Sequence, residues 1–149
     1  MIKFVFLILF TSLQCNAFNA KVISVTDGDT IHVINQSLKI TVRLSGIDTP
    51  ELKQMYGNEA KDILSEKILN KIVTIKGISK DRYGRLIGDI FLNDRWINYE
   101  LINEGIAWHY KKYSDDIKLS KAEKEARDNG IGIWSQINPI APWDYRKNN

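Results

Sequence analysis

The chain has 149 residues, of which 21 are Lys or Arg and 18 are Asp or Glu, so its formal net charge at pH 7 is +3. This length suits one domain that can bury a core without disulfides, and the mildly basic balance permits a polyanionic partner without requiring one. The chain has a single cysteine, and its two histidines do not form a short metal-ligand pair. These features argue against zinc and thiol chemistry.

Residues 1–17 predict a secretory signal peptide. Lys3 precedes an apolar run at residues 4–10, and small residues up to Ala17 form a cleavage site, while the segment is too short to span a membrane. Cleavage would remove the cysteine and lower the net charge to +2, because Lys plus Arg drops from 21 to 20 while Asp plus Glu stays at 18. We therefore expect a periplasmic or secreted protein that leaves the membrane after cleavage. Lipid attachment at Cys15 is the competing interpretation, and the bulky Gln14 before it argues against a lipoprotein signal.

Residues 20–47 predict a three-stranded meander. Apolar and polar residues alternate from Lys39 to Leu44, as in a half-buried strand. The turn Asp27-Gly28-Asp29 joins the first two strands, and we expect Gly28 to supply a positive φ there. The expected strands are Lys21–Thr26, Thr30–Ile34 and Leu38–Ile47.

Two further strands and three helices are expected after Pro50. The first helix is predicted to be capped by Asn58, and the tail, residues 136–149, is predicted to be an irregular flap packed by its aromatic side chains. The expected strands are 72–78 and 85–92, and the expected helices begin at Asn58, Asn98 and Ile117. The sequence therefore predicts an α+β domain at residues 18–135: a five-stranded OB-type β-barrel with three helices.

The segment Arg43–Glu51 carries the clearest candidate site. Alternation places Arg43 on the polar face of its strand, and Pro50 ends that strand, leaving Asp48 and Glu51 on a stiff, exposed turn. A permanent cation beside two carboxylates can hold a divalent metal against a phosphodiester. The alternative is an ordinary surface salt bridge at the end of a strand.

Two other turns carry similar side chains. Asp29 lies in the turn Asp27-Gly28-Asp29-Thr30, and Arg85 closes the glycine turn Asp81-Arg82-Tyr83-Gly84-Arg85. Each alone fits an ordinary turn or a basic loop. Together with Arg43–Glu51 they supply oxygen ligands for a hard cation, a spare carboxylate and two permanent cations, all in loops that a scaffold can bring to one end.

These motifs resemble the staphylococcal nuclease, or thermonuclease, family of OB-type barrels. The resemblance covers residues 20–134 and includes residues 98–107 and the closing Ile133-Trp134-Ser135. It implies that Asp29, Asp48 and the backbone carbonyl of Thr49 bind Ca²⁺. It further implies that Glu51 is the general base for the attacking water, and that Arg43 and Arg85 hold the phosphate oxygens.

The same resemblance implies that Arg82 and Tyr83 contact the substrate. Tyr113 is a further candidate, whereas Tyr110 is less supported because the spacing of residues 108–113 departs from the best-known member of the family. Stacking on aromatic side chains tolerates many base sequences, which suits an enzyme that cuts many sequences.

The expected function is an exported, calcium-dependent endonuclease that hydrolyses DNA and RNA and leaves 3′-phosphate ends. No stable protein partner is implied, and a monomer is the default. A noncatalytic nucleic-acid-binding OB-type module and a calcium-stabilised adhesion or inhibitor domain are the alternatives. The presence of all five matching catalytic and metal-binding side chains favours the enzyme.

Overall fold

The structure is a computed structural model that describes residues 17–149. Apart from Ala17, the predicted signal peptide lies outside the described residues, so that assignment stays a prediction. Among the described residues, no helix has the length and apolar character needed to cross a bilayer.

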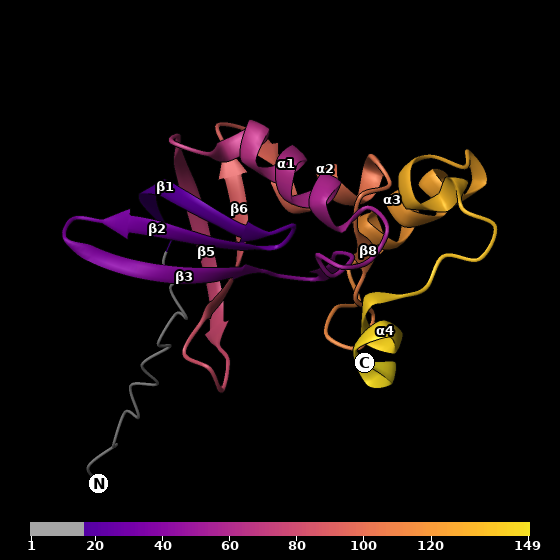
Figure 1. Cartoon of the computed structure of the whole chain (residues 1–149). Coiled ribbons are helices and arrows are strands. Elements are labelled where there is room, and N and C mark those ends of the chain that lie inside the picture. Colours follow the sequence, from indigo (N-terminus) through magenta and orange to yellow (C-terminus); the bar gives the residue numbers. More distant parts are fainter. Residues whose placement is uncertain (1–16) are drawn as a thin grey trace, which may run out of the picture.

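Five strands form a closed barrel (Figure 1). Neighbouring strands pair in the order β3-β2-β1-β5-β6, and a parallel pairing of β3 with β6 joins the two ends of this sheet. The predicted OB-type α+β barrel is therefore confirmed. The barrel strands are β1 (Ala17–Asp27), β2 (Thr30–Asn35), β3 (Leu38–Leu44), β5 (Ile72–Lys80) and β6 (Leu86–Leu92).

Alternating side chains along these strands fill the barrel. In β3, Val42 and Leu44 are buried, while Arg43 between them lies on the other face. The remaining strands contribute β-branched residues, which pack well on a pleated surface. Fully buried examples are Val22, Ile31, Val33, Ile75 and Ile90.

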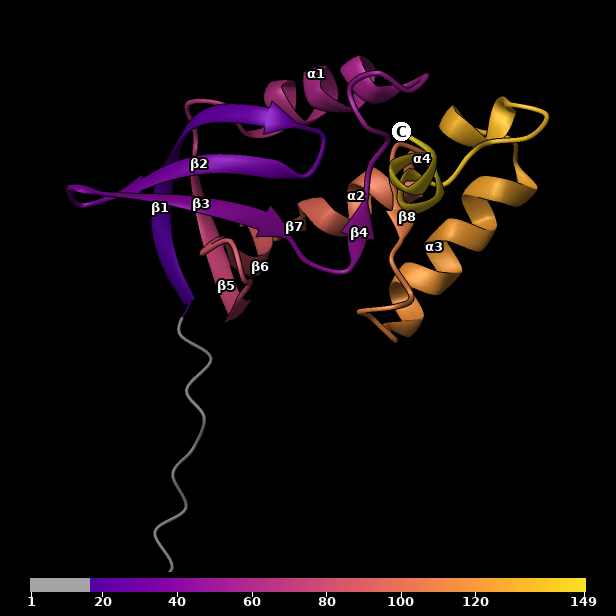
Figure 2. The ribbon, with the colours of Figure 1, turned by 60° about the horizontal axis from the view of Figure 1, so that its bottom comes forward.

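Residues 17–149 form four α-helices, one more than the sequence predicts, and α3 and α4 lie together to one side of the barrel (Figure 2). Helix α1 packs on β1, and α2 lies between β6 and α3. Three two-residue strands complete the fold: β7 pairs with β6, and β4 pairs with β8. The bounds are α1 (Gly57–Ile68), α2 (Ile97–Asn103), α3 (Ile117–Asp128), α4 (Pro142–Asn148), β4 (Ile47–Asp48), β7 (Arg95–Trp96) and β8 (Trp108–His109).

The prediction that Asn58 caps α1 is wrong. The helix begins one residue earlier, after Tyr56, which has a left-handed backbone and makes no side-chain cap. Only glycine fits at the first residue of the helix, because a Cβ on Gly57 would lie 2.0 Å from the carbonyl oxygen of Glu51.

The tail is more ordered than predicted. Residues 132–135 form a 3-10 helix, and α4 follows with Pro142 in its first turn. The expected aromatic packing is present: Trp108 meets Trp134 edge to face at 4.4 Å and Trp143 at 5.4 Å between ring centroids. This second apolar cluster, next to the barrel core, holds α4 against β8.

Gly28 is required for space and not for a positive φ. The structure gives it no left-handed backbone, which corrects the prediction, but a Cβ there would lie 2.6 Å from the hydroxyl oxygen of Thr49 and 2.7 Å from the Cβ of Ala60. The predicted turn bond is confirmed, since the backbone N–H of Asp29 donates to Asp27 at 3.1 Å. The β1–β2 turn thus packs directly on the segment after β4.

We expect Gly28→Ala to lower the free energy of unfolding by about 1–3 kcal/mol, because the added methyl group overpacks the contact with Thr49. Gly84→Ala is the matched control: its Cβ would meet nothing within 4 Å, and only its φ of +78° opposes the change, costing about 1 kcal/mol. Urea denaturation measures both. A smaller loss for Gly28→Ala than for Gly84→Ala would contradict this account.

Candidate active site

Arg43 joins two buried carboxylates at the end of β3. Its Nε lies 3.2 Å from Oδ1 of Asp29, and its Nη2 lies 3.1 Å from Oδ1 of Asp48. Its Nη1 donates to the carbonyl oxygens of Leu44 at 2.7 Å and Ile47 at 2.9 Å. One guanidinium therefore fixes the turn between β3 and β4 and brings both aspartates to the same place.

Asp29 ties the β1–β2 turn to the segment after β4. Its Oδ2 accepts hydrogen bonds from the backbone N–H of Thr49 at 2.8 Å and from the Thr49 hydroxyl at 2.9 Å. Thr49 is itself buried. Two of the three predicted motifs thus meet, and the predicted metal-binding residues Asp29, Asp48 and Thr49 lie together.

Asp48 is buried, with 1% exposure, although the sequence predicts an exposed turn. The strand pairing explains this, because β4 pairs with β8 and Asp48 lies opposite Trp108. Burial raises the pKa of Asp48, and the charge of Asp29 adds to the rise, while hydrogen bonds from Arg146 and the charge of Arg43 oppose it. Burial and the Asp29 charge likewise raise the pKa of Asp27 to about 6. The cluster is rich in carboxylates and attracts cations.

Glu51 is partly buried, and hydrogen bonds with Gln54 hold its backbone in place. The side-chain carbonyl of Gln54 accepts from the backbone N–H of Glu51 at 2.8 Å, and the Gln54 N–H donates back to the Glu51 carbonyl at 2.7 Å. Gly57 packs on the same carbonyl. The backbone of Glu51 is therefore fixed, while its carboxylate reaches the edge of the cluster.

Arg146 is the site residue that the sequence analysis missed. Its Nη2 lies 2.8 Å from Oδ2 of Asp48, and its Nη1 lies 2.7 Å from Oε1 of Glu51. The tail does carry a helix signal, since Pro142 stands at a first-turn position and basic residues follow in the last turn. No local signal indicates that this helix reaches a carboxylate 98 residues earlier in the chain.

The donor atoms of this cluster fit a hard cation. Ca²⁺ prefers carboxylate and carbonyl oxygens at flexible geometry, and Asp29, Asp48 and the Thr49 carbonyl supply such atoms. Within residues 17–149, however, no three acidic, His or Cys side chains are arranged to hold a metal ion. The guanidinium groups of Arg43 and Arg146 take the cationic positions instead. Calcium binding therefore requires at least one of these guanidinium groups to release its carboxylate oxygens.

Arg85 is not in contact with the cluster. Its Nε pairs with Oδ2 of Asp81 at 2.7 Å, within the β5–β6 turn. The turn stands beside β3, because the parallel ladder pairs Val42 with Leu86. Arg85 thus enters β6 next to the strand that carries Arg43, but its side chain faces its own hairpin.

The predicted substrate-binding residues lie at two exposed places. Tyr83, at the tip of the β5–β6 turn, is 69% exposed, and the Arg82 guanidinium lies 4.9 Å from its ring centroid. Tyr113 is also 69% exposed and meets Tyr110 edge to face at 4.9 Å. The structure does not bring Tyr83 and Tyr113 into contact.

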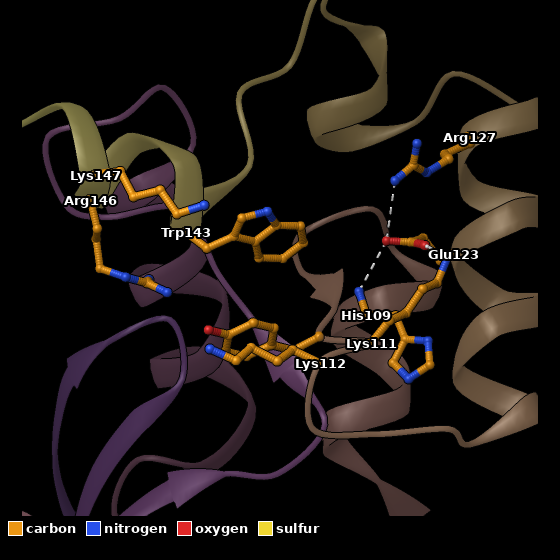
Figure 3. A pocket seen from close by; sticks show the side chains of 9 residues that line it. His109, Lys111, Lys112, Glu123, Arg127, Trp143, Arg146 and Lys147 are labelled. Atoms are coloured by element: carbon orange, nitrogen blue, oxygen red, sulfur yellow. Dashed lines mark hydrogen bonds and ion pairs between the residues drawn. The ribbon is translucent and has the colours of Figure 1, made fainter.

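A cavity of about 540 Å³ lies beside the cluster (Figure 3). Residues of α4 form one wall and residues of α3 the opposite wall, and Arg146 belongs both to this cavity and to the carboxylate cluster. Tyr110, the less supported candidate, lines it and stacks on Trp143 at 5.2 Å between ring centroids. Its remaining lining residues are mostly basic: His109, Lys111, Lys112, Glu123, Arg127 and Lys147.

Comparison with known proteins identifies the class to which this barrel and carboxylate cluster belong. The family described as Staphylococcal nuclease homologue matches residues 41–136, more than half of the chain. The chain therefore belongs to the staphylococcal nuclease family, which confirms the resemblance carried by the three motifs.

Individual relatives agree with this assignment. An "Uncharacterized endonuclease" of Escherichia coli O157:H7 is 35% identical over 148 residues, 97% of each chain, and one of Haemophilus influenzae is 36% identical over 145 residues, 95% of this chain and 82% of that protein. "Staphylococcal-like nuclease CAN1" of Arabidopsis thaliana is 43% identical over 110 residues, 74% of this chain. The chain spans only about a third of that plant relative (34%). These relatives support a nuclease function.

His109 fixes β8, and through it Asp48 on β4. The imidazole is buried between the hydroxyl groups of Ser114, at 2.9 Å, and Ser120, at 3.1 Å. Burial lowers the pKa of His109. The unfolded chain therefore binds this proton more readily than the folded chain, and stability is lost as the pH falls through the unfolded value of about 6.5.

We expect the change in melting temperature from pH 7 to pH 5 to be less favourable in the parent than in His109→Gln, which cannot titrate at this position; the carboxyl of Asp27, whose pKa is raised to about 6, acts in the opposite direction in both proteins. Scanning calorimetry of both proteins across this range measures the difference. An identical pH dependence in the two proteins would contradict the assignment of this effect to His109.

Proposed function

We propose that this chain is an exported, calcium-dependent nuclease that hydrolyses phosphodiester bonds of DNA and RNA and leaves 3′-phosphate ends. The observation that carries the proposal is the convergence of Asp29, from the β1–β2 turn, with Asp48 and Glu51, from β4 and the residues after it, on one cluster bridged by guanidinium groups. Membership of the staphylococcal nuclease family supports the same reaction class.

The proposal assigns each side chain a task. Asp29, Asp48 and the Thr49 carbonyl would hold Ca²⁺, which would supply Lewis-acid activation of the phosphate. Glu51 accepts a proton from the attacking water; it suits this role because it is the most exposed carboxylate of the cluster, at 38% side-chain exposure against 2% for Asp48. The new bond joins the water oxygen to phosphorus, the bond to the 5′ oxygen breaks, and that oxygen takes a proton from solvent to leave as a hydroxyl group.

Arg43 and Arg85 are proposed to stabilise the charge that develops on the phosphate oxygens. Fixed guanidinium donors suit this task, because they keep their charge and form paired hydrogen bonds with phosphate. Arg43 already lies in the cluster, whereas Arg85 must exchange Asp81 for the substrate. This exchange is plausible on energetic grounds, since the Arg85–Asp81 pair is partly exposed, with side-chain exposures of 33% and 19%.

The substrate is proposed to lie across the face that holds the cluster, between the β5–β6 turn and the cavity beside α4. Arg82 and Tyr83 would contact it on one side, and Tyr113 on the other. Exposed aromatic rings next to cations favour flexible or single-stranded nucleic acid, whose unstacked bases can reach them.

Glu51→Gln tests the catalytic assignment. We expect the variant to fold, to bind heat-denatured DNA as the parent does, and to cut it at least about 100-fold more slowly, because general-base catalysis contributes about 10²–10⁴-fold. Cleavage is measured with purified residues 18–149, in calcium or in a chelator. Gel analysis of the products with a phosphatase identifies the 3′ ends.

Glu59→Gln is the matched control, since Glu59 lies in the first turn of α1 and makes no contact with the cluster; it should cut as the parent does. Cutting by the parent in the chelator, or full activity in Glu51→Gln, would reject the mechanism. Binding without cutting by the parent would favour the noncatalytic nucleic-acid-binding module, and calcium-dependent stability without either would favour an adhesion or inhibitor domain.

Replacement of the two arginines should separate catalysis from stability. Arg85→Ala is expected to lower kcat about 100- to 1000-fold, as for the loss of one good donor, and to change stability by less than about 1 kcal/mol. Arg43→Ala should lower kcat similarly and also cost about 3 kcal/mol, because it leaves Asp29 and Asp48 without their shared partner. Urea denaturation and single-turnover cleavage measure the two effects; equal stability losses would contradict this division.

A further inference from the structure

Helix α4 places a cation inside the proposed metal site. Arg146 contacts Asp48 through both terminal nitrogens, at 3.2 Å to Oδ1 and 2.8 Å to Oδ2, and contacts Glu51 at 2.7 Å. Residue 146 lies beyond residues 41–136, which match the family. The contact therefore comes from the tail, outside the stretch that matches the family model.

The carboxylate oxygens that calcium needs are already in use. Arg146 engages both oxygens of Asp48, and Arg43 shares one of them. In Asp29, Oδ1 pairs with Arg43 and Oδ2 accepts two hydrogen bonds from Thr49. Because Arg43 also holds two backbone carbonyls, Arg146 is the cation that can leave at lower cost to the fold.

The position of Arg146 allows such a movement while α4 stays in place. The helix is held by Trp143, which stacks on Tyr110 and packs on Trp108, and by the buried Pro142. The Arg146 side chain is 40% exposed and also borders the cavity of Figure 3. Its guanidinium can therefore turn away from the carboxylates into solvent or into this cavity.

We propose that Arg146 is a resident counter-ion of the metal site, which Ca²⁺ must displace from Asp48 and Glu51. This inference rests on the proposed function and adds to it a residue that sets the metal affinity. Without calcium, Arg146 balances the carboxylates and holds them together. When calcium binds, Arg146 releases the carboxylate oxygens of Asp48 and Glu51. The tail therefore raises the calcium concentration that is needed to fill the site.

Calorimetric titration of Ca²⁺ into the folded chain, without nucleic acid, tests this proposal. Arg146→Gln should bind Ca²⁺ about tenfold more tightly than the parent, because the metal no longer competes with a charge-assisted pair. In chelator the variant should melt at a lower temperature than the parent. Calcium should raise the melting temperature of the variant by more than it raises that of the parent. Lys147→Gln is the matched control, since Lys147 pairs with Asp144 on the same helix; it should bind calcium as the parent does.

Equal or weaker calcium binding by Arg146→Gln would overturn the inference and leave the proposed nuclease intact, provided that the parent binds calcium and cuts. Absence of calcium binding in all three proteins would overturn both. If Arg146→Gln fails to fold, Arg146→Lys serves instead: it keeps the charge but not the paired geometry, so a smaller gain of about threefold is expected. No gain in Arg146→Lys would then reject the proposal.

Discussion

The arrangement of this molecule depends on the guanidinium of Arg43. Taking two aspartates out of water is costly unless a cation and hydrogen bonds compensate, and Arg43 supplies both to Asp29 and Asp48. The same side chain closes the turn after β3 by holding two carbonyl oxygens. Fold and site therefore share one interaction, and the carboxylates remain together because the turn cannot open without losing it.

The strand pairings of the closed barrel determine which segments lie next to Arg43 and its two aspartates. The parallel pairing of β3 with β6 sets the β5–β6 turn beside Arg43, and the β4–β8 pairing buries Asp48 beneath the tail. The buried amide of Asn98 reinforces this junction, since it donates to the carbonyl of Ser45 and accepts from the N–H of Ile90. Residues from four parts of the chain thus reach one face of the molecule. Sites built on loops depend on a rigid scaffold of this kind to position them.

The sequence predicted the parts that local pattern determines. Alternation along β3 placed Arg43 correctly, and three ordered motifs identified the family and the barrel. It did not predict the burial of Asp48 or the role of Gly28, because both depend on which segment packs against them. It also could not place Arg146, since an ion pair between residues far apart leaves no periodic or local signal. The Arg85–Asp81 pair is local, but no local pattern in the sequence indicates that Asp81 holds Arg85 away from the carboxylate cluster.

The second apolar cluster bears on where an independent piece of this protein can be cut. Trp108, Ile133 and Trp134 lie within the stretch shared with the family, whereas Ala141 and Trp143, which cover them, lie after it. At the other end, β1 and β2 precede residue 41 yet form part of the barrel wall. A fragment cut at residues 41 and 136 would therefore have an open barrel and exposed tryptophan side chains. Such an exposed apolar surface favours association with other copies of the fragment. A stable fragment therefore needs residues on both sides of the stretch that matches the family model.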